Sequence, residues 1–262
     1  MTKIISVVNQ KGGVGKTTTA INLATAFSTL GKKILVIDFD PQGNATTGLG
    51  IIEKGKTSGS YEVLIGKVPF AYAYLSTSIP NLYVLPANIH LSGAEVELVT
   101  LKNREYLLQE ALKELDDFQY VFIDCPPSLG LLTLNALVAS SSALIPLQCE
   151  FYALEGLSQI LSTLNYVRGH LNPKLRLQGI VLTMFDSRSN LNVQVAQDVR
   201  MHLKRNVYQT AIPRNIRLAE APSFGKPAVI YDLKCFGSQA YLQLAKEILN
   251  QEGPTHEGEI AA

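Results

Sequence analysis

The residues from Lys11 to Thr18 have the types and spacing of a loop that binds the phosphates of a nucleotide. Their sequence is Lys-Gly-Gly-Val-Gly-Lys-Thr-Thr. Glycines allow the backbone to curl so that successive N–H groups point toward phosphate oxygens. We expect Lys16 to reach the β- and γ-phosphates and the Thr17 hydroxyl to ligate Mg²⁺. The residues predicted to bind nucleotide in this loop are Lys11, Gly12, Gly13, Val14, Gly15, Lys16, Thr17 and Thr18.

This loop departs from the strict G-x-x-x-x-G-K-[ST] pattern at its first position. Gln10 stands where the pattern requires glycine, and a second lysine, Lys11, follows it. A glycine-rich turn that binds nothing is the alternative. It is disfavoured because an apolar run precedes the loop and apolar residues at helical spacing follow it, as in a strand, a phosphate loop and a helix. A small-molecule kinase is disfavoured because Lys11 would have no role there.

Three acidic residues follow apolar runs that we interpret as buried strands. Asp38 ends one run, Asp40 comes shortly after it, and Asp124 ends another. Because ligands of an open parallel sheet sit at the carboxyl ends of its strands, these acids should lie beside the phosphate loop. We predict that Thr17, Asp38 and Asp124 form the magnesium shell, directly or through water, and that Asp40 positions or activates the attacking water. A polar turn or a helix cap is the plain alternative for these acids.

The elements that must position these residues alternate between strand and helix, which predicts an α/β fold with a doubly wound, mostly parallel sheet flanked by helices. A single domain over residues 1–250 is expected, followed by a disordered acidic tail over 251–262. In the longest predicted helix, over residues 95–115, Val96 and Val99 should face the core. The expected strands span 4–8, 33–37, 82–85, 120–124, 143–147, 178–183 and 207–212. The expected helices span 16–29, 60–66, 71–75, 95–115, 154–168, 190–205 and 238–250.

The composition fits a globular protein of the cytoplasm. The chain has 262 residues, of which 47% are hydrophobic and 17% charged, and it has no apolar run long enough to predict a membrane span. The predicted first strand leaves no room for a signal peptide. The three cysteines, Cys125, Cys149 and Cys235, are scattered, so we expect reduced thiols rather than a metal site.

Positive charge is concentrated in the second half of the chain. Residues 168–234 contain eleven Lys or Arg and four Asp or Glu, a net charge of +7, whereas the whole chain has +1. A basic segment on a near-neutral chain favours a polyanionic partner such as DNA or RNA. Ordinary solvated charge spread over several faces is the alternative.

Taken together, the motifs resemble those of the ParA/Soj partition ATPases of the ParA/MinD superfamily. These are P-loop NTPases with a deviant Walker A loop, and the resemblance extends along essentially the whole chain. It rests on the segments 11–18, 38–44, 122–127, 183–188 and 212–222.

The resemblance implies an enzyme, a Mg²⁺-dependent ATPase that hydrolyses ATP slowly to ADP and phosphate. It also implies an ATP-bound sandwich homodimer that binds double-stranded DNA without sequence preference. A ParB-type centromere-binding partner would stimulate hydrolysis and release the protein from DNA. The expected role is chromosome or plasmid partitioning, in the cytoplasm and associated with the nucleoid.

The resemblance also assigns roles to individual residues. Lys11, Lys16 and Asp40 would be catalytic, with Lys11 crossing to the ATP of the other subunit. Gly12 would lie where two subunits approach, so that a side chain there blocks dimerisation. The other residues assigned in this way are Pro213 and Asn215, beside the adenine, and Arg188 and Arg217, in contact with DNA.

Several alternatives remain. A MinD-like membrane-cycling ATPase would need a basic amphipathic helix at the C-terminus, whereas residues 250–262 contain three glutamates and no lysine or arginine. A redox protein with a shared cluster would need paired cysteines, which Cys125 and Cys149 do not match. A nucleotide switch with negligible turnover is disfavoured by Asp40. Because nothing precedes the first strand that could form a helix-turn-helix, we expect no sequence-specific operator binding. Because residues 250–262 carry no basic amphipathic pattern, we expect no membrane contact.

Overall fold

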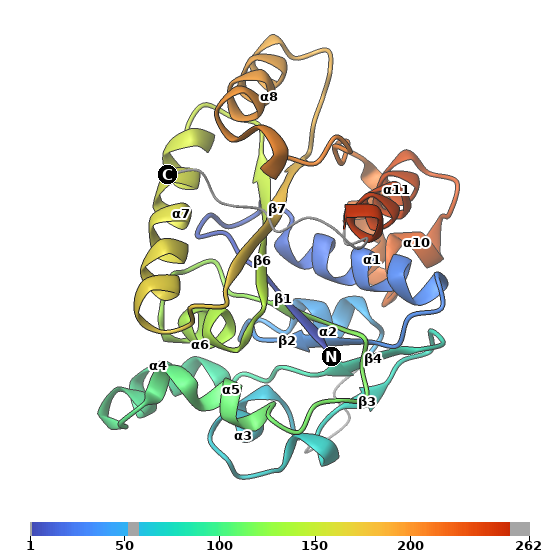
Figure 1. Ribbon diagram of the computed structural model, residues 1–262. Coiled ribbons are helices and arrows are strands. Elements are labelled where there is room, and N and C mark those ends of the chain that lie inside the picture. Colours follow the sequence, from blue (N-terminus) through green and yellow to red (C-terminus); the bar gives the residue numbers. More distant parts are fainter. Residues whose placement is uncertain (1, 52–57, 252–262) are drawn as a thin grey trace.

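A seven-stranded sheet with helices on both faces forms the molecule, as the computed structural model shows for residues 2–51 and 58–251 (Figure 1). The strand order is β3-β4-β2-β5-β1-β6-β7, and only β3 and β4 pair antiparallel. The predicted doubly wound, mostly parallel α/β fold is confirmed. The strands are β1 (Lys3–Val7), β2 (Ile34–Asp38), β3 (Leu75–Ser76), β4 (Leu82–Leu85), β5 (Tyr120–Asp124), β6 (Ser142–Gln148) and β7 (Arg176–Thr183).

Each central strand contributes apolar side chains to both faces of the sheet. In β2, Ile34 and Val36 point to one hydrophobic core, and Leu35 and Ile37 point to the other. All four are fully buried. A strand buried on both faces needs a continuous apolar run rather than an alternating one, which is why the sequence shows this strand so clearly.

Helices cover the two faces in two groups. The core that contains Ile34 is closed by α1 (Lys16–Thr29), α2 (Asn44–Gly48), α9 (Ile216–Glu220), α10 (Ala228–Tyr231) and α11 (Phe236–Gln251). The core that contains Leu35 is closed by α3 (Ser60–Leu64), α4 (Leu91–Glu97), α5 (Leu107–Ala111), α6 (Leu131–Ala139), α7 (Ala153–His170) and α8 (Asn190–Leu203).

The single long helix predicted over 95–115 is wrong. The helix ends at Thr100 because the backbone of Leu101 is extended, with φ of −80° and ψ of 139°, and Asn103 follows in a left-handed conformation with φ of 57°. Val96 and Val99 are 78% and 56% exposed, because the core side of this stretch is occupied by Leu91, Ala94 and Leu98. The short pieces are α4, η2 (Leu98–Thr100), η3 (Arg104–Tyr106) and α5.

The strand predicted over 207–212 is also wrong. This segment runs beside β7 and makes only isolated bridging contacts, in which the Tyr208 N–H donates to the Ile180 carbonyl at 2.9 Å. The buried Tyr208 ring stands against Gly179, where an added Cβ would lie 2.5 Å from the ring, and no regular ladder forms. The helix predicted over 71–75 is instead the turn η1 (Phe70–Tyr72) followed by β3.

The predicted tail over 251–262 lies outside the described residues, apart from Gln251, which ends α11. In the described part of the chain, no helix is both long and apolar enough to cross a membrane.

Candidate nucleotide site

The phosphate loop joins β1 to α1 and is shaped by its glycines. Gly13 and Gly15 have φ values of 76° and 89°, a region that favours glycine. Gly15 begins α1, and its carbonyl accepts a hydrogen bond from the Thr19 N–H at 2.9 Å. The Thr183 hydroxyl, at the end of β7, donates to the Val14 carbonyl at 2.8 Å. The loop is therefore held from both sides at the carboxyl edge of the sheet.

Lys16 is a buried cation in this loop, with only 6% of the residue exposed. Its ammonium donates to the Lys11 carbonyl at 2.9 Å, so it lies over the loop. Burial lowers the pKa of Lys16, and the carboxylate of Asp124 acts in the opposite direction. A buried ammonium on a loop of N–H donors is suited to a polyanionic ligand such as a nucleotide phosphate.

Asp38 lies at the end of β2 with its carboxylate already oriented. One oxygen, Oδ2, accepts hydrogen bonds from the Thr46 N–H at 2.7 Å and from the Thr46 hydroxyl at 2.6 Å. Oδ1 accepts from the Asp40 N–H at 3.3 Å. Burial is nonetheless the dominant influence and raises the pKa of Asp38 to about 6. With its oxygens engaged, Asp38 is better placed to hold a metal-bound water than to ligate the ion directly.

Asp124 lies directly opposite Asp38 in the register of β5 and β2. It is fully buried, and neither carboxylate oxygen has a partner at hydrogen-bonding geometry among the described residues. Burial first, and then the charge of Asp38, raises the pKa of Asp124 well above its ordinary value, although the nearby Thr17 hydroxyl favours the charged form. A buried carboxylate without a partner is a place where a cation would fit.

Magnesium rather than an all-protein metal centre suits this arrangement. No group of three or more His, Cys, Asp or Glu side chains within 2–51 and 58–251 could hold a metal ion. Mg²⁺ in nucleotide sites usually has one or two protein ligands, with phosphates and water completing the octahedron. Asp124 and Thr17, whose hydroxyl lies near the Asp124 carboxylate, could supply those protein ligands, with Asp38 on the neighbouring strand.

Asp40 lies at the same edge, and only 7% of the residue is exposed. Its Oδ1 accepts a hydrogen bond from the Gln42 N–H at 3.0 Å, which fixes the carboxylate after the turn. The charge of Asp40 contributes to the raised pKa values of both Asp38 and Asp124. The structure therefore brings together Lys16, Asp38, Asp40 and Asp124, as the sequence predicts.

Lys11 has a different environment from Lys16. Its side chain is 51% exposed, and its ammonium forms an ion pair with Glu150, which follows β6. The Lys11 N–H donates to the Asn9 Oδ1 at 3.0 Å, and the Asn9 amide donates to the Pro146 carbonyl at 2.8 Å. Glu150 was missed by the sequence analysis, as was Thr46, because neither belongs to a motif that indicates its contact.

Gly12 has room for a side chain within its own subunit. An added Cβ would lie 4.0 Å from the Cβ of Pro127, an ordinary van der Waals distance. Nothing in the described part of this chain therefore requires glycine at position 12.

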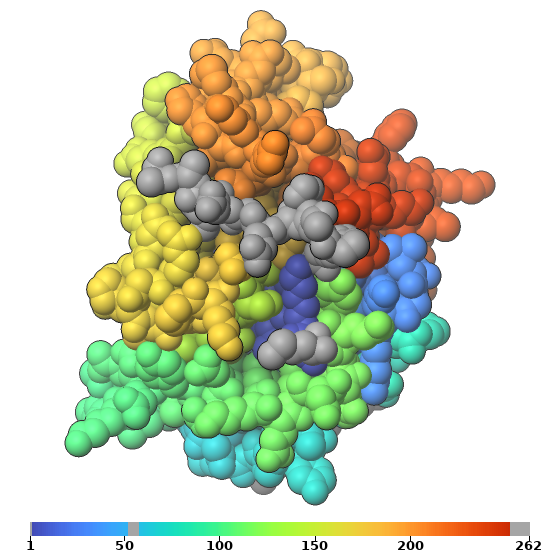
Figure 2. Space-filling view, viewed as in Figure 1, coloured from blue at the N-terminus to red at the C-terminus, as the bar shows by residue number. Residues whose placement is uncertain are grey.

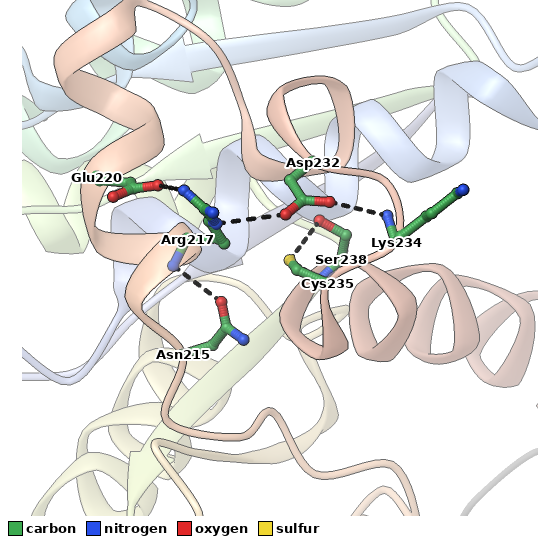
Figure 3. A network of polar contacts seen from close by, with 7 residues as sticks. All are labelled: Asn215, Arg217, Glu220, Asp232, Lys234, Cys235 and Ser238. Carbon is green, nitrogen blue, oxygen red and sulfur yellow. Dashed lines mark hydrogen bonds and ion pairs between the residues drawn. The ribbon is translucent and has the colours of Figure 1, made fainter.

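Pro213 and Asn215 follow the extended segment beside β7. Pro213 bridges to Phe185, two residues beyond the strand end that holds the phosphate loop. Asn215 caps α9, and its Oδ1 accepts a hydrogen bond from the Arg217 N–H at 2.9 Å (Figure 3). Both residues thus come from the edge of the sheet that carries the loop.

The two arginines predicted to contact DNA are each paired with acids of the same chain. Arg188 is 89% exposed and makes two hydrogen bonds to Asp186, at 2.9 and 2.8 Å. These bonds lower the pKa of Asp186 to about 2. Arg217 is 51% exposed and pairs with Glu220 and, at 3.4 Å, with Asp232 (Figure 3). The sequence analysis identified these arginines without their carboxylate partners, and any DNA contact must compete with these pairs.

Comparison with known proteins supports a nucleotide-dependent role. A family model described as an AAA domain matches residues 2–177. The chromosome partitioning protein ParA of Caulobacter vibrioides is 53% identical over 95% of both chains. The sporulation initiation inhibitor protein Soj of Bacillus subtilis is 51% identical over 95% of this chain and 98% of its own.

Solved structures of other proteins have the same fold as this chain. Cobyrinic acid a,c-diamide synthase from Mycobacterium smegmatis, with bound ADP and magnesium, has a TM-score of 0.84 and 39% identity over 97% of each chain. The septum site-determining protein MinD from Pyrococcus horikoshii, complexed with Mg-ADP, has a TM-score of 0.80 and 29% identity over 97% of this chain and 98% of its own. With relatives above 50% identity along almost its whole length, and with the loop and acids in place, the chain belongs to the ParA/Soj family of chromosome-partitioning ATPases.

Proposed function

We propose that this protein hydrolyses ATP in a Mg²⁺-dependent reaction and thereby drives chromosome or plasmid partitioning in the cytoplasm, at the nucleoid. The observation that carries the proposal is the buried carboxylate of Asp124, to which no described residue donates a hydrogen bond of good geometry, together with the buried ammonium of Lys16 that its charge reaches. One group would hold a cation and the other would neutralise phosphate, so a Mg²⁺–nucleotide complex satisfies both at once.

The chemistry follows from the positions of the chain's own groups. Lys16 and the loop N–H groups would hold the β- and γ-phosphates, while Thr17 and Asp124 hold Mg²⁺ and Asp38 orients a water in its shell. Asp40 would align the attacking water with the γ-phosphate. Bound Mg²⁺ would supply charge neutralisation on the phosphates, and positioning together with electrostatics would account for most of the rate enhancement.

Pairing of two subunits would depend on ATP through Lys11. Each Lys11 would cross a two-fold axis to the other subunit's nucleotide, so the exchanged lysines would neutralise phosphate charge only when two nucleotides are present. Gly12 would lie at this approach, and Pro213 and Asn215 would border the adenine.

DNA binding would follow from dimerisation. Residues 168–234 carry a net charge of +7, and bringing two such segments onto one duplex would raise avidity through effective concentration. Arg188 and Arg217 would contact phosphates, which gives affinity without sequence reading. A ParB-type partner would stimulate hydrolysis and release the dimer.

The test combines turnover and binding. We expect phosphate release with ATP and Mg²⁺ that is abolished in Lys16→Ala and in Asp40→Ala, with Asp40→Ala still binding ATP. Binding to a random-sequence duplex should require ATP and should fail with ADP. Turnover that survives in Asp40→Ala would contradict the proposed mechanism. Binding to anionic vesicles in place of DNA would instead favour the MinD-like alternative, for which the structural likeness to MinD is the supporting observation.

A further inference from the structure

Lys11 is attached to its own subunit by an ion pair that the proposed function does not use. Its ammonium pairs with Glu150, which lies between the end of β6 and the start of α7. The two side chains are 51% and 29% exposed, so the pair lies at the surface of the subunit. Phe151 and Tyr152 follow immediately and are 76% and 67% exposed.

A second contact attaches the same part of the chain to α7. The Gln10 amide donates to the Gln159 side-chain oxygen, and Asn9 is bonded to the Pro146 carbonyl of β6. Three successive residues, Asn9, Gln10 and Lys11, thus contact β6, α7 and the segment between them. Of these three contacts, only the Lys11–Glu150 pair joins two charged groups. It also involves the side chain that the proposed dimer places on the other subunit's nucleotide.

The Lys11 ammonium cannot pair with Glu150 and contact a second subunit's nucleotide at the same time. We propose that Glu150 is a positioning residue that retains Lys11 within its own subunit and thereby opposes pairing until a polyphosphate of sufficient charge displaces it. This inference rests on the proposed crossing of Lys11. A triphosphate carries more negative charge than a diphosphate, so ATP would release Lys11 more effectively than ADP.

The size of the effect follows from the exposure of the pair. A partly exposed ion pair changes an equilibrium by at most about fivefold. Two pairs break when a two-fold symmetric dimer forms, so removing both should lower the dimer dissociation constant by up to about 25-fold.

The pair itself can be tested in the nucleotide-free protein with a carbodiimide, which joins a carboxylate to an amine in contact with it. We expect a Lys11–Glu150 cross-link within the subunit, detected by peptide mass spectrometry, and its loss when ATP is added to the Asp40→Ala protein. The ion pair of Lys113 with Glu110 is the internal control, because it lies on α5 and the residues after it and should cross-link equally in both states. A Lys11–Glu150 cross-link that is absent without nucleotide, or unchanged by ATP, would overturn the inference.

Dimerisation is measured by analytical ultracentrifugation with ATP, in the Asp40→Ala background to prevent turnover. Glu150→Gln should tighten the dimer by up to about 25-fold. Glu155→Gln, an exposed glutamate in the first turn of α7, is the matched control and should leave it unchanged. Dimerisation that Glu150→Gln leaves the same or weakens would refute the role of Glu150. If the Asp40→Ala parent itself stays monomeric with ATP, the proposed ATP-dependent dimer fails instead, and the inference fails with it.

Discussion

Two buried aspartates face each other at the centre of the site, and in the absence of a ligand they cost stability. Asp38 has a folded pKa of about 6, against 3.8 in its unperturbed state. The folded protein therefore binds more protons than the unfolded chain between these values, and its stability falls as pH rises through that window. In EDTA and without nucleotide, we expect the free energy of unfolding to drop by at most about 3 kcal/mol between pH 4 and pH 7 from this group.

Urea unfolding at a series of pH values measures this dependence. Mg²⁺ with ATP should remove most of it, because a bound cation favours the charged carboxylates. Asp38→Asn should flatten the profile of the nucleotide-free protein, because the amide does not titrate. Asp124→Asn should abolish stabilisation by Mg²⁺. An unchanged pH profile in Asp38→Asn would show that this carboxylate is not its origin.

Thr46 gives a second prediction at the residue scale. Its hydroxyl donates to Asp38 and accepts from the Ala87 N–H at 3.0 Å, so Thr46→Val leaves two buried polar groups short of a partner. We expect a loss of about 1–3 kcal/mol in unfolding free energy and a marked loss of ATP turnover. Thr46→Ser should retain both properties. Thr47→Val, on the exposed side of the same helix, is the control, and an equal effect there would refute the argument.

The sequence predicted the acids of the site but not the residues that hold them. Asp38 and Asp124 could be predicted because each ends an apolar run, and parallel strands bring their carboxyl ends to one edge. The contact of Thr46 with Asp38 depends on a turn in which Gly43 has φ of 63°, and the contact of Glu150 with Lys11 depends on how β6 ends beside β1. Neither of these contacts could be predicted from a local sequence pattern.

At the scale of elements, prediction succeeded for the central strands and for long helices with one apolar face, such as α7 and α11, but it missed the largely buried helix α6 and failed over residues 95–115. The β1–loop–α1 unit was predicted closely because its strand and helix are buried along most of their length. The region 95–115 has apolar residues at approximate helical spacing, but Val96 and Val99 are exposed and the chain leaves helical geometry at Leu101. Helical spacing alone could not distinguish a core-facing side chain from an exposed one.

The phosphate loop offers a matched pair of glycine substitutions. Gly12→Ala fits within the subunit, so its thermal stability and ATP binding should equal those of the unmodified protein while ATP-dependent dimerisation is lost. An added Cβ at position 15 also has space, but a φ of 89° is strained for any residue other than glycine. Gly15→Ala should therefore cost about 1–2 kcal/mol of stability. Calorimetry and sedimentation distinguish the two. Normal dimerisation of Gly12→Ala would mean that position 12 is not at a subunit interface.

Over the whole molecule, acidic and basic residues are unevenly distributed along the chain. Residues 95–117 contain seven acidic and three basic residues and include α5 and part of α4, which lie at the lower left of the molecule in Figure 1. The basic stretch includes α8, which protrudes at the top in Figures 1 and 2. Lys204 and Arg205 follow α8, and Arg205 is exposed. α8 itself carries one acid, Asp198, and one arginine, Arg200, so a polyanion that approaches this end of the molecule would meet Lys204 and Arg205.

DNA binding by the ATP-bound protein should therefore weaken steeply with salt and respond to charge on one side only. Arg188→Ala should lower affinity and reduce the slope of log K against log salt by about one for each phosphate that its guanidinium neutralises. Because Asp186 competes for the Arg188 guanidinium, Asp186→Asn should raise affinity. Lys113→Ala, on the acidic side, should change neither quantity. Fluorescence anisotropy over a salt series measures all three. Equal effects of Arg188→Ala and Lys113→Ala would indicate that net charge, rather than a defined surface around α8, governs DNA binding.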